Sequence, residues 1–270
     1  LHQWAVENNI DCQLVEKKIT EFGRQIPQPD YLLVVDFGYL IPDWLLKIPI
    51  IAPVNLHPSA LPRWRGSSPG QLVILSGEKQ SAICLIKLTE KLDSGPVIAQ
   101  ENFEVDDSWT SADYYLHAFD LASKQIADWL VAHKNGKVLE KSQPVESPTS
   151  VAKKITKDDA FVDWEVLNSL MKELPNNDNQ QKTSSNSLIS TFLNNTPQKE
   201  WSELIERSCR AFWPWPILWT IIPTTKGPKR MQLHKCEVSK DSQNIKLVLK
   251  EVKIEGMSQS GWNQVKNLVI

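Results

Sequence analysis

Three polar side chains of this sequence have the types and positions that a proton-transfer site requires. Asn55 and His57 come at the end of one apolar run, and Asp93 lies in a turn-forming segment after another. Because the working residues of an open α/β sheet lie beyond the carboxyl ends of its strands, we expect these side chains to converge. An amide donor, an imidazole and a carboxylate can stabilise a developing oxyanion and move one proton. Each residue type also has an ordinary role in turns, so the trio alone leaves a structural interpretation open.

The segment that carries two of these residues, NLHPSALPRWRG (55–66), is rich in proline, serine and arginine. This composition indicates a loop that presents groups at the end of a strand rather than packing them. The overlapping GSSPG (66–70) also fits the G-x-S-x-G turn of α/β-hydrolases, with Ser68 as nucleophile. That turn needs a buried strand directly before it, and LPRWR is not one, so the hydrolase interpretation is disfavoured.

The elements that must position the trio alternate between strand and helix through the first half of the chain. Thr110 and Asp113 form a capping pattern at the start of one helix, and Gly77 ends another. The alternation predicts an α/β domain with a mainly parallel sheet. We expect strands at 30–38, 49–56, 81–89 and 96–105, and helices at 67–77 and 110–133.

The second half has a different pattern. Residues 139–160 are polar and contain proline, which indicates a linker. Residues 175–199 contain 16 Asn, Gln, Ser or Thr in 25 positions, which indicates a disordered surface insertion. A helix with Trp201, Leu204, Ile205, Cys209 and Phe212 on one face is followed by short strands at 217–222, 231–238, 245–254 and 268–270. This order predicts a small β-barrel or sandwich.

The overall composition is that of an ordinary globular protein of 270 residues, 41% hydrophobic and 23% charged. No run is long and apolar enough for a membrane span and no leader pattern is present, so we expect a cytoplasmic protein. Four widely spaced cysteines, Cys12, Cys84, Cys209 and Cys236, predict reduced core thiols and no metal site. Residues 151–270 carry 17 Lys and Arg against 13 Asp and Glu, so this part is the candidate for contact with a polyanion.

Two motifs in register closely resemble the signature of the formyltransferase family that includes methionyl-tRNA formyltransferase. They are NLHPSALPRWRGSSPGQ (55–71) and KLDSGPVIAQE (91–101). Further segments resemble later parts of the tRNA-formylating branch, namely ITKDDAFVDW (155–164), CRAFWPWP (209–216) and VKIEGMSQSGWNQVKN (252–267). Sugar N-formyltransferases share the first two motifs, and the later segments favour the tRNA branch.

The resemblance implies a Rossmann-like formyltransferase domain at residues 1–138, lacking its first strands. A linker at 139–160 would lead to a tRNA-binding, OB-like β-barrel at 161–270, with the polar insertion at about 175–199. The implied activity moves the formyl group of 10-formyltetrahydrofolate to the α-amine of methionyl-initiator-tRNA for translation initiation, by a monomer without metal. The alternatives are a sugar N-formyltransferase, or an inactive fragment that binds RNA or a protein partner.

The resemblance also assigns residues. The catalytic positions of the family match Asn55, His57 and Asp93. Folate would contact Phe37, Gly38, Leu40, Ser59, Leu61, Pro62 and Leu92. The tRNA would contact Arg63, Arg65, Lys226, Lys229 and Arg230. Trp64 would either stack on an unpaired base or pack in the core.

Three features depart from the family. Its members carry a further segment, with a central first strand, before the position where this chain starts, so we expect the activity of the complete gene product and not of this chain alone. Asp36 and Phe37 stand where members usually have Ala and Tyr, and a buried Asp36 would need a partner. The polar insertion has no counterpart.

Overall fold

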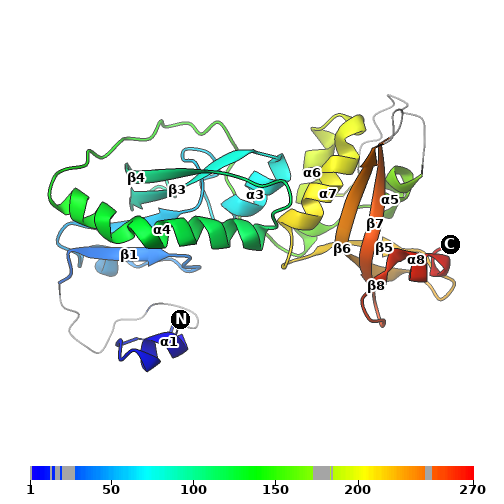
Figure 1. Ribbon diagram of the computed structural model, residues 1–270, viewed down its shortest axis with the longest axis horizontal. Coiled ribbons are helices and arrows are strands. Elements are labelled where there is room, and N and C mark those ends of the chain that lie inside the picture. Colours follow the sequence, from blue (N-terminus) through cyan, green and yellow to red (C-terminus); the bar gives the residue numbers. More distant parts are fainter. Residues whose placement is uncertain are drawn as a thin grey trace. The chain divides into compact units, whose positions relative to one another are not determined.

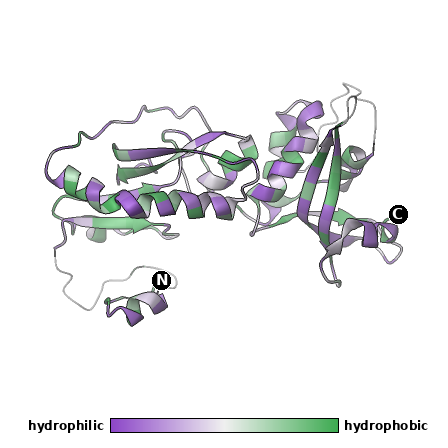
Figure 2. Ribbon diagram, viewed as in Figure 1, coloured by the Kyte–Doolittle hydropathy of each residue, from purple (hydrophilic) through white to green (hydrophobic). Residues whose placement is uncertain are grey.

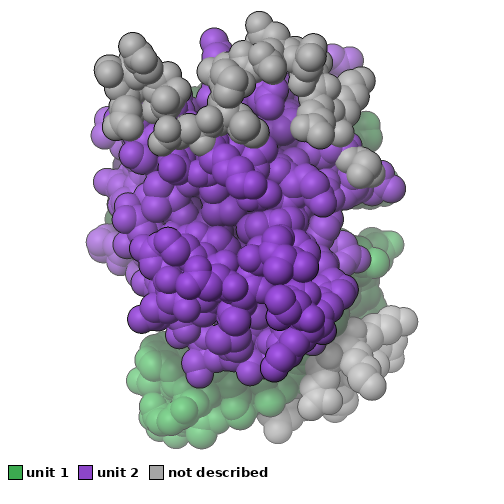
Figure 3. Space-filling model, turned by 90° about the vertical axis from the view of Figure 1, so that its right-hand side faces the viewer, with its two compact units in different colours: residues 1–57, 84–99, 127–143 green, residues 58–83, 100–126, 144–270 purple. Residues whose placement is uncertain are grey.

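The computed structural model describes residues 2–12, 14–15, 19, 28–172, 183, 185–240 and 245–270 (Figure 1). The chain divides into two compact units (Figure 3). The first unit contains residues 1–57, 84–99 and 127–143, and the second contains 58–83, 100–126 and 144–270. Each unit therefore combines segments that are distant in the sequence. Within the described part of the chain, none of the helices has both the length and the apolar character needed to cross a membrane.

The first sheet has the strand order β1-β2-β3-β4. Its strands are β1 (Tyr31–Val35), β2 (Ala52–His57), β3 (Gln80–Lys87) and β4 (Val97–Glu104). β1 pairs with β2 in parallel, whereas β2 pairs with β3 antiparallel. The sheet is therefore mixed, and the prediction of a mainly parallel sheet was wrong. A buried strand such as β3 is a continuous apolar run in either direction, so its composition does not encode its orientation.

The helices of the first half are α1 (His2–Glu7), α2 (Asp43–Leu46), α3 (Pro69–Ser76) and α4 (Ser111–Lys134). α3 follows Ser68, has Pro69 at its first position and ends at Gly77 in the left-handed conformation (φ 71°), as its local sequence predicts. α4 starts with a reciprocal cap, in which the Thr110 backbone N–H donates to Asp113 Oδ2 (2.9 Å) and the Asp113 backbone N–H donates to Thr110 Oγ1 (3.3 Å). Hydrophilic and hydrophobic residues alternate along α4 (Figure 2), which is typical of a helix packed on one side.

The second half contains a separate antiparallel sheet in the order β5-β6-β7-β8. Its strands are β5 (Leu218–Ile222), β6 (Lys229–Lys240), β7 (Ile245–Ile254) and β8 (Ser260–Gly261). The helices are α5 (Trp164–Met171), α6 (Leu188–Asn194), α7 (Trp201–Ala211) and α8 (Trp262–Val265), with 3-10 turns at Asp158–Ala160, Gln198–Glu200 and Lys266–Leu268. β6 and β7 change register on both sides of Lys235, a β-bulge that increases the local twist of the strand pair.

Two expectations for the second half were wrong. α6 lies within the predicted disordered insertion, and it buries Ile189 and Leu193 almost completely. The polar composition concealed this helix because only a few apolar residues hold it. Residues 268–270 do not form a full strand, since Val269 makes one isolated bridge, with Thr224. Residues 175–182 and 184 of the expected insertion lie outside the described residues.

The apolar face of α7 packs as the sequence predicts. Trp201, Leu204, Ile205 and Cys209 are all less than 5% exposed. Cys84 and Cys236 are buried free thiols as well, whereas Cys12 is an exposed free thiol, so the prediction of core thiols was wrong for Cys12.

Candidate active site

Asn55 and His57 lie on β2, an interior strand of the first sheet. In the pairing register, Asn55 is opposite Val34 on one side and Ile86 on the other, and His57 is opposite Cys84. Because side chains alternate along a strand, Asn55 and His57 point to the same face of the sheet. His57 is only 3% exposed. The strand therefore presents an amide and an imidazole side by side at its carboxyl end.

Asp93 lies in the turn between β3 and β4, and hydrogen bonds define the shape of this turn. The Gln143 side-chain amide donates to the carbonyl oxygens of Asp93 (3.0 Å) and Gly95 (2.7 Å). A Cβ on Gly95 would lie 1.8 Å from the Lys87 carbonyl oxygen, so only glycine fits there. Asp93 itself has a left-handed backbone (φ 46°), which Asp adopts more readily than most residues. The turn thus fixes the direction in which this carboxylate points.

The His57 imidazole and the Asp93 carboxylate come together. His57 Nδ1 lies 3.7 Å from Asp93 Oδ2, and the side chains are 4% and 9% exposed. The distance is longer than a direct hydrogen bond but short enough for a strong charge interaction in a site shielded from water. The expected convergence of these two residues is therefore present in the first unit.

The loop after β2 is packed, and the expectation that it presents its groups was wrong. Ser59 Oγ donates to the Arg63 carbonyl (2.7 Å). Ser147 Oγ donates to the Pro62 carbonyl (2.7 Å), and Thr149 Oγ1 accepts from the Trp64 backbone N–H (2.7 Å). Loop 58–68 is held by the segment at 144–152, which belongs to the predicted linker. The polar residues of both segments satisfy buried backbone groups, which explains a composition that resembles exposed loops.

Glu78 anchors two neighbouring side chains of this loop. Its carboxylate accepts from the Trp64 indole N–H (2.6 Å) and from Arg63 Nη2 (2.5 Å). Trp64 is 6% exposed and therefore packs in the core, which decides between the two roles considered for it. The hydrogen bond that Arg63 donates to Glu78 raises the pKa of Arg63. The Arg63 side chain remains 39% exposed, so part of it still faces solvent.

Arg65 and Gly66 are structural residues of the same loop. The Arg65 guanidinium donates to the carbonyls of Pro144 (2.7 Å) and Val145 (3.2 Å), and Arg65 is 9% exposed. This burial contradicts the expectation that Arg65 faces a tRNA. Gly66 pairs with Ala152, and a Cβ on Gly66 would lie 2.3 Å from the Ala152 carbonyl oxygen. At Gly66 the loop therefore lies too close to the Ala152 backbone for any residue other than glycine.

Ser68, the nucleophile of the hydrolase alternative, is also tied into this packing. It is 6% exposed, and its hydroxyl accepts a hydrogen bond from the Ile155 N–H (3.3 Å). No buried strand precedes it, because residues 58–68 form the loop described above. The arrangement is that of a structural serine before α3.

The residues expected to contact folate fall into two groups. In the first unit, Phe37, Leu40 and Leu92 are 37%, 94% and 63% exposed, and a Cβ on Gly38 would meet open space. In the second unit, Ser59 and Leu61 are buried, and Leu61 precedes Pro62 through a cis peptide bond. Asp36, beside the first group, is exposed with a left-handed backbone (φ 46°), so its charge needs no buried partner.

The basic residues expected to bind tRNA in the second half lie at and after the β5–β6 turn. Lys226 is exposed, and Lys229 Nζ donates to the Glu255 carbonyl (3.3 Å). The Arg230 guanidinium lies 4.2 Å from the Trp219 ring centroid, a cation–π contact that holds it in place. Sequence reasoning missed Gln143 and Glu78, because no local pattern shows which distant backbone or indole group a side chain will meet.

Comparisons with known proteins show a family that the chain resembles. Residues 7–130 match the Formyl transferase family. The chain is 27% identical over 218 residues to "Methionyl-tRNA formyltransferase" of Idiomarina loihiensis, which covers 80% of this chain and 58% of that protein. The chain spans about half the length of the curated relatives it matches, for example 49% of the methionyl-tRNA formyltransferase of Pseudoalteromonas translucida.

Two solved structures share the fold. Methionyl-tRNA formyltransferase from Clostridium thermocellum superposes with a TM-score of 0.52 at 16% identity, covering 84% of this chain and 78% of that chain. WlaRD, a sugar 3N-formyl transferase solved in the presence of dTDP and 5-N-formyl-THF, gives a TM-score of 0.53 at 18% identity, covering 89% and 70%. At these identities the likeness shows the fold alone.

Proposed function

We propose that the protein transfers the formyl group of 10-formyltetrahydrofolate to the α-amine of methionyl-initiator-tRNA, and the match of residues 7–130 to the Formyl transferase family supports this proposal. The curated relatives at up to 35% identity are methionyl-tRNA formyltransferases, which supports this acceptor over a nucleotide sugar. The activity belongs to the complete protein that contains this chain, in the cytoplasm, and the protein acts as a monomer.

The observation that carries the proposal is the pairing of His57 with Asp93 beside Asn55. In the proposed reaction, the amine attacks the formyl carbon and a tetrahedral intermediate forms. Asn55 and His57 stabilise its oxyanion by hydrogen bonds. Asp93 sets the charge of His57 and helps to carry the proton from the attacking amine to the leaving folate nitrogen as the bond to the formyl carbon breaks. The reaction needs no metal and no covalent nucleophile.

The folate donor would bind through the apolar residues assigned to it. Phe37, Leu40 and Leu92 are exposed in the same unit as His57, and a planar pterin ring needs such apolar surface. Gly38 leaves space beside them.

The antiparallel sheet of the second half would hold the tRNA. We assign residues 1–138 to the catalytic domain, 139–160 to the connection and 161–270 to an OB-like C-terminal domain, in which the bulge at Lys235 curves the sheet. Lys226, Lys229 and Arg230 would contact phosphates, together with the exposed part of Arg63. Arg65 is not part of this face because it is buried.

The test is a formyl-transfer assay on the complete gene product with 10-formyltetrahydrofolate and Met-charged initiator tRNA. Transfer that is lost in His57→Ala, with the fold retained, supports the proposal. Transfer to a nucleotide amino-sugar and not to the tRNA would move the protein to the sugar branch. A folded protein that is inactive with both acceptors but still binds tRNA would be a binding module.

A further inference from the structure

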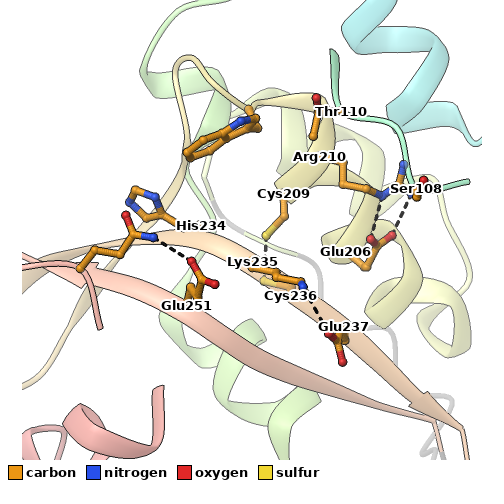
Figure 4. Close-up of a pocket in the computed structure, with 12 residues that line it drawn as sticks. Ser108, Thr110, Glu206, Cys209, Arg210, His234, Lys235, Cys236, Glu237 and Glu251 are labelled. Carbon is orange, nitrogen blue, oxygen red and sulfur yellow. Dashed lines mark hydrogen bonds and ion pairs between the residues drawn. The ribbon is translucent and has the colours of Figure 1, made fainter. Parts of the chain in front are cut away.

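A pocket of about 450 Å³ lies wholly within the second unit, between α7 and the sheet strands β6 and β7 (Figure 4). The proposed catalytic trio belongs to the first unit, so this pocket is a separate feature. Its lining includes two thiols, Cys209 of α7 and Cys236 of β6. The neighbouring ring of His234 packs against Trp213, with ring centroids 5.5 Å apart.

The two thiols face each other. Cys209 Sγ lies 2.7 Å from Cys236 Sγ, and both residues are buried free cysteines (Figure 4). A disulfide bond is about 2.05 Å long, so a small movement of the side chains would join the sulfurs. The residues are 27 positions apart, on a helix and a strand that pack together. Two thiols that meet in this way, in a pocket that admits a small reagent, form a site for covalent modification.

We propose that Cys209 and Cys236 are an oxidation site at which a low-molecular-weight disulfide converts the two thiols into one intramolecular disulfide that ties α7 to β6. The inference rests on this geometry and not on the proposed function.

The disulfide forms in two successive thiol–disulfide exchange steps. The thiolate of one cysteine attacks a sulfur of the reagent, the reagent S–S bond breaks, and one reagent thiol leaves with a proton. The second cysteine, as thiolate, then attacks the protein sulfur of this mixed disulfide and releases the other reagent thiol. Two protein thiols thus lose two electrons and two protons, and the reagent gains them as two thiols.

The surroundings set the rate of this exchange. Burial raises the pKa of the Cys209 thiol well above its usual value, so little thiolate is present at neutral pH. The charged groups around the pair are Glu206 and Arg210 of α7, Lys235 and Glu237 of β6, and Glu251 of β7. Arg210 is held by Glu206 through two hydrogen bonds (2.7 and 2.9 Å), so it does not point freely at the thiols. Exchange is therefore slow near neutrality and accelerates as the pH rises.

The disulfide would restrain a helix that already has anchoring contacts within the unit. Arg207 Nε donates to the Leu75 carbonyl (3.1 Å) and Arg210 Nη1 to the Trp109 carbonyl (2.9 Å). A covalent link between α7 and β6 lowers the conformational entropy of the unfolded chain, and this stabilises the folded state. We expect the melting temperature of the oxidised protein to rise by several degrees, and the rise to disappear on reduction.

The experiment treats the folded full chain with excess bis(2-hydroxyethyl) disulfide at neutral and alkaline pH, then blocks remaining thiols under denaturing conditions. Peptide mapping without reductant should recover Cys209 linked to Cys236, with Cys84 still blocked as a free thiol. The link should form faster at the higher pH. The same treatment of a Cys12→Ser variant should give the same link, because the exposed thiol plays no part.

The cysteine linkage is measured on the parent protein, so the test does not depend on whether a core variant folds. Recovery of both Cys209 and Cys236 as free thiols from the folded protein at both pH values would overturn the inference. Recovery of stable reagent adducts on either cysteine, or of links to Cys84 or Cys12, would overturn it as well. A Cys209→Ser variant that folds should show no link and no oxidant-dependent rise in melting temperature.

Discussion

His57 Nδ1 lies 3.7 Å from Asp93 Oδ2, although His57 ends strand β2 and Asp93 lies in the turn between β3 and β4. The β2 strand fixes the imidazole and a turn pinned by Gln143 fixes the carboxylate. Two independently positioned groups therefore share one charge interaction.

Asp93→Asn should reduce formyl transfer in the complete protein by about 10² to 10⁴, the usual effect of losing a proton-transfer group. Asn tolerates the left-handed backbone of this position (φ 46°), so the fold should be retained. Single-turnover transfer rates and circular dichroism check the two statements. Asp128→Asn, at an exposed position of α4, is the matched control and should transfer at the parental rate. Activity of Asp93→Asn within about threefold of the parent would remove Asp93 from the mechanism.

Gly66→Ala should lower the free energy of unfolding by about 2 to 4 kcal/mol, because the new Cβ collides with the Ala152 carbonyl and the backbone is left-handed. Gly136→Ala is the matched control. It also has positive φ (66°), but nothing lies within 4 Å of its Cβ, so we expect a cost of only about 1 kcal/mol. Denaturant unfolding measures both. Equal losses in the two variants would mean that the close approach at Gly66 does not matter.

Glu78→Ala should lower the free energy of unfolding by about 2 to 3 kcal/mol, since it leaves the buried Trp64 indole N–H without its acceptor. The loss of the partly exposed ion pair to Arg63 adds little. Glu90→Ala, at an exposed position, should change stability by less than about 0.5 kcal/mol. Indole fluorescence of Trp64 in the folded protein should also change in Glu78→Ala. An unaltered denaturation midpoint would contradict the anchoring role.

Glu140→Gln should destabilise the protein in a pH-dependent way. Burial raises the pKa of Glu140, but hydrogen bonds from His133 (3.1 Å) and Lys87 (3.3 Å) outweigh it and lower the pKa below its ordinary value. Because the pKa is lower in the folded state, the contribution of Glu140 to stability is complete above the ordinary value of 4.5 and is lost as the pH falls through the lower folded-state pKa.

Unfolding titrations between about pH 3 and 7 check this dependence, because they span the ordinary pKa of a glutamate. The stability difference between the parent and Glu140→Gln should be constant at the upper end and vanish at the lower end. Glu146→Gln, at an exposed position of the same segment, should show no such difference. A difference that persists unchanged at the lowest pH would show that charge is not its source.

Replacing Lys226 and Lys229 by Ala should weaken tRNA binding and make it less salt-dependent. Each lost phosphate contact should reduce the slope of log K against log salt by about 0.7 to 0.9. Filter binding or fluorescence anisotropy at several salt concentrations measures the slope. Lys124→Ala with Lys137→Ala removes two exposed charges at and just after α4 and should leave the slope as in the parent. The same slope in both double variants would exclude the β5–β6 turn from the tRNA face.

Local signals determined which elements the sequence could predict. α3 and α4 begin and end where their caps and Gly77 indicate, because capping depends on neighbouring residues. The direction of β3 could not be predicted, since a strand buried on both faces has no directional pattern. α6 was missed because Ile189 and Leu193 are its only fully buried apolar residues within a polar tract.

The sequence allowed the reactive side chains of the candidate site to be named, but it did not reveal the hydrogen bonds that hold the surrounding loop and turn in place. Asn55 and His57 lie at the carboxyl end of β2 and Asp93 follows β3, and all three have side chains with recognisable chemistry. Arg65 looked like a ligand for phosphate because the sequence does not show that the Pro144 and Val145 carbonyls lie beside it. Burial of an arginine depends on which distant backbone groups need donors, and that information is absent from local spacing.

Loop 58–68 and segment 144–152 depend on each other for their hydrogen bonds, and this sets limits on how the chain can be divided. A catalytic domain cut at residue 138 would lose the partners of Pro62, Trp64 and Arg65, and would expose the apolar surface that those residues cover. Shortened versions of this protein should therefore retain the chain at least to Ala152.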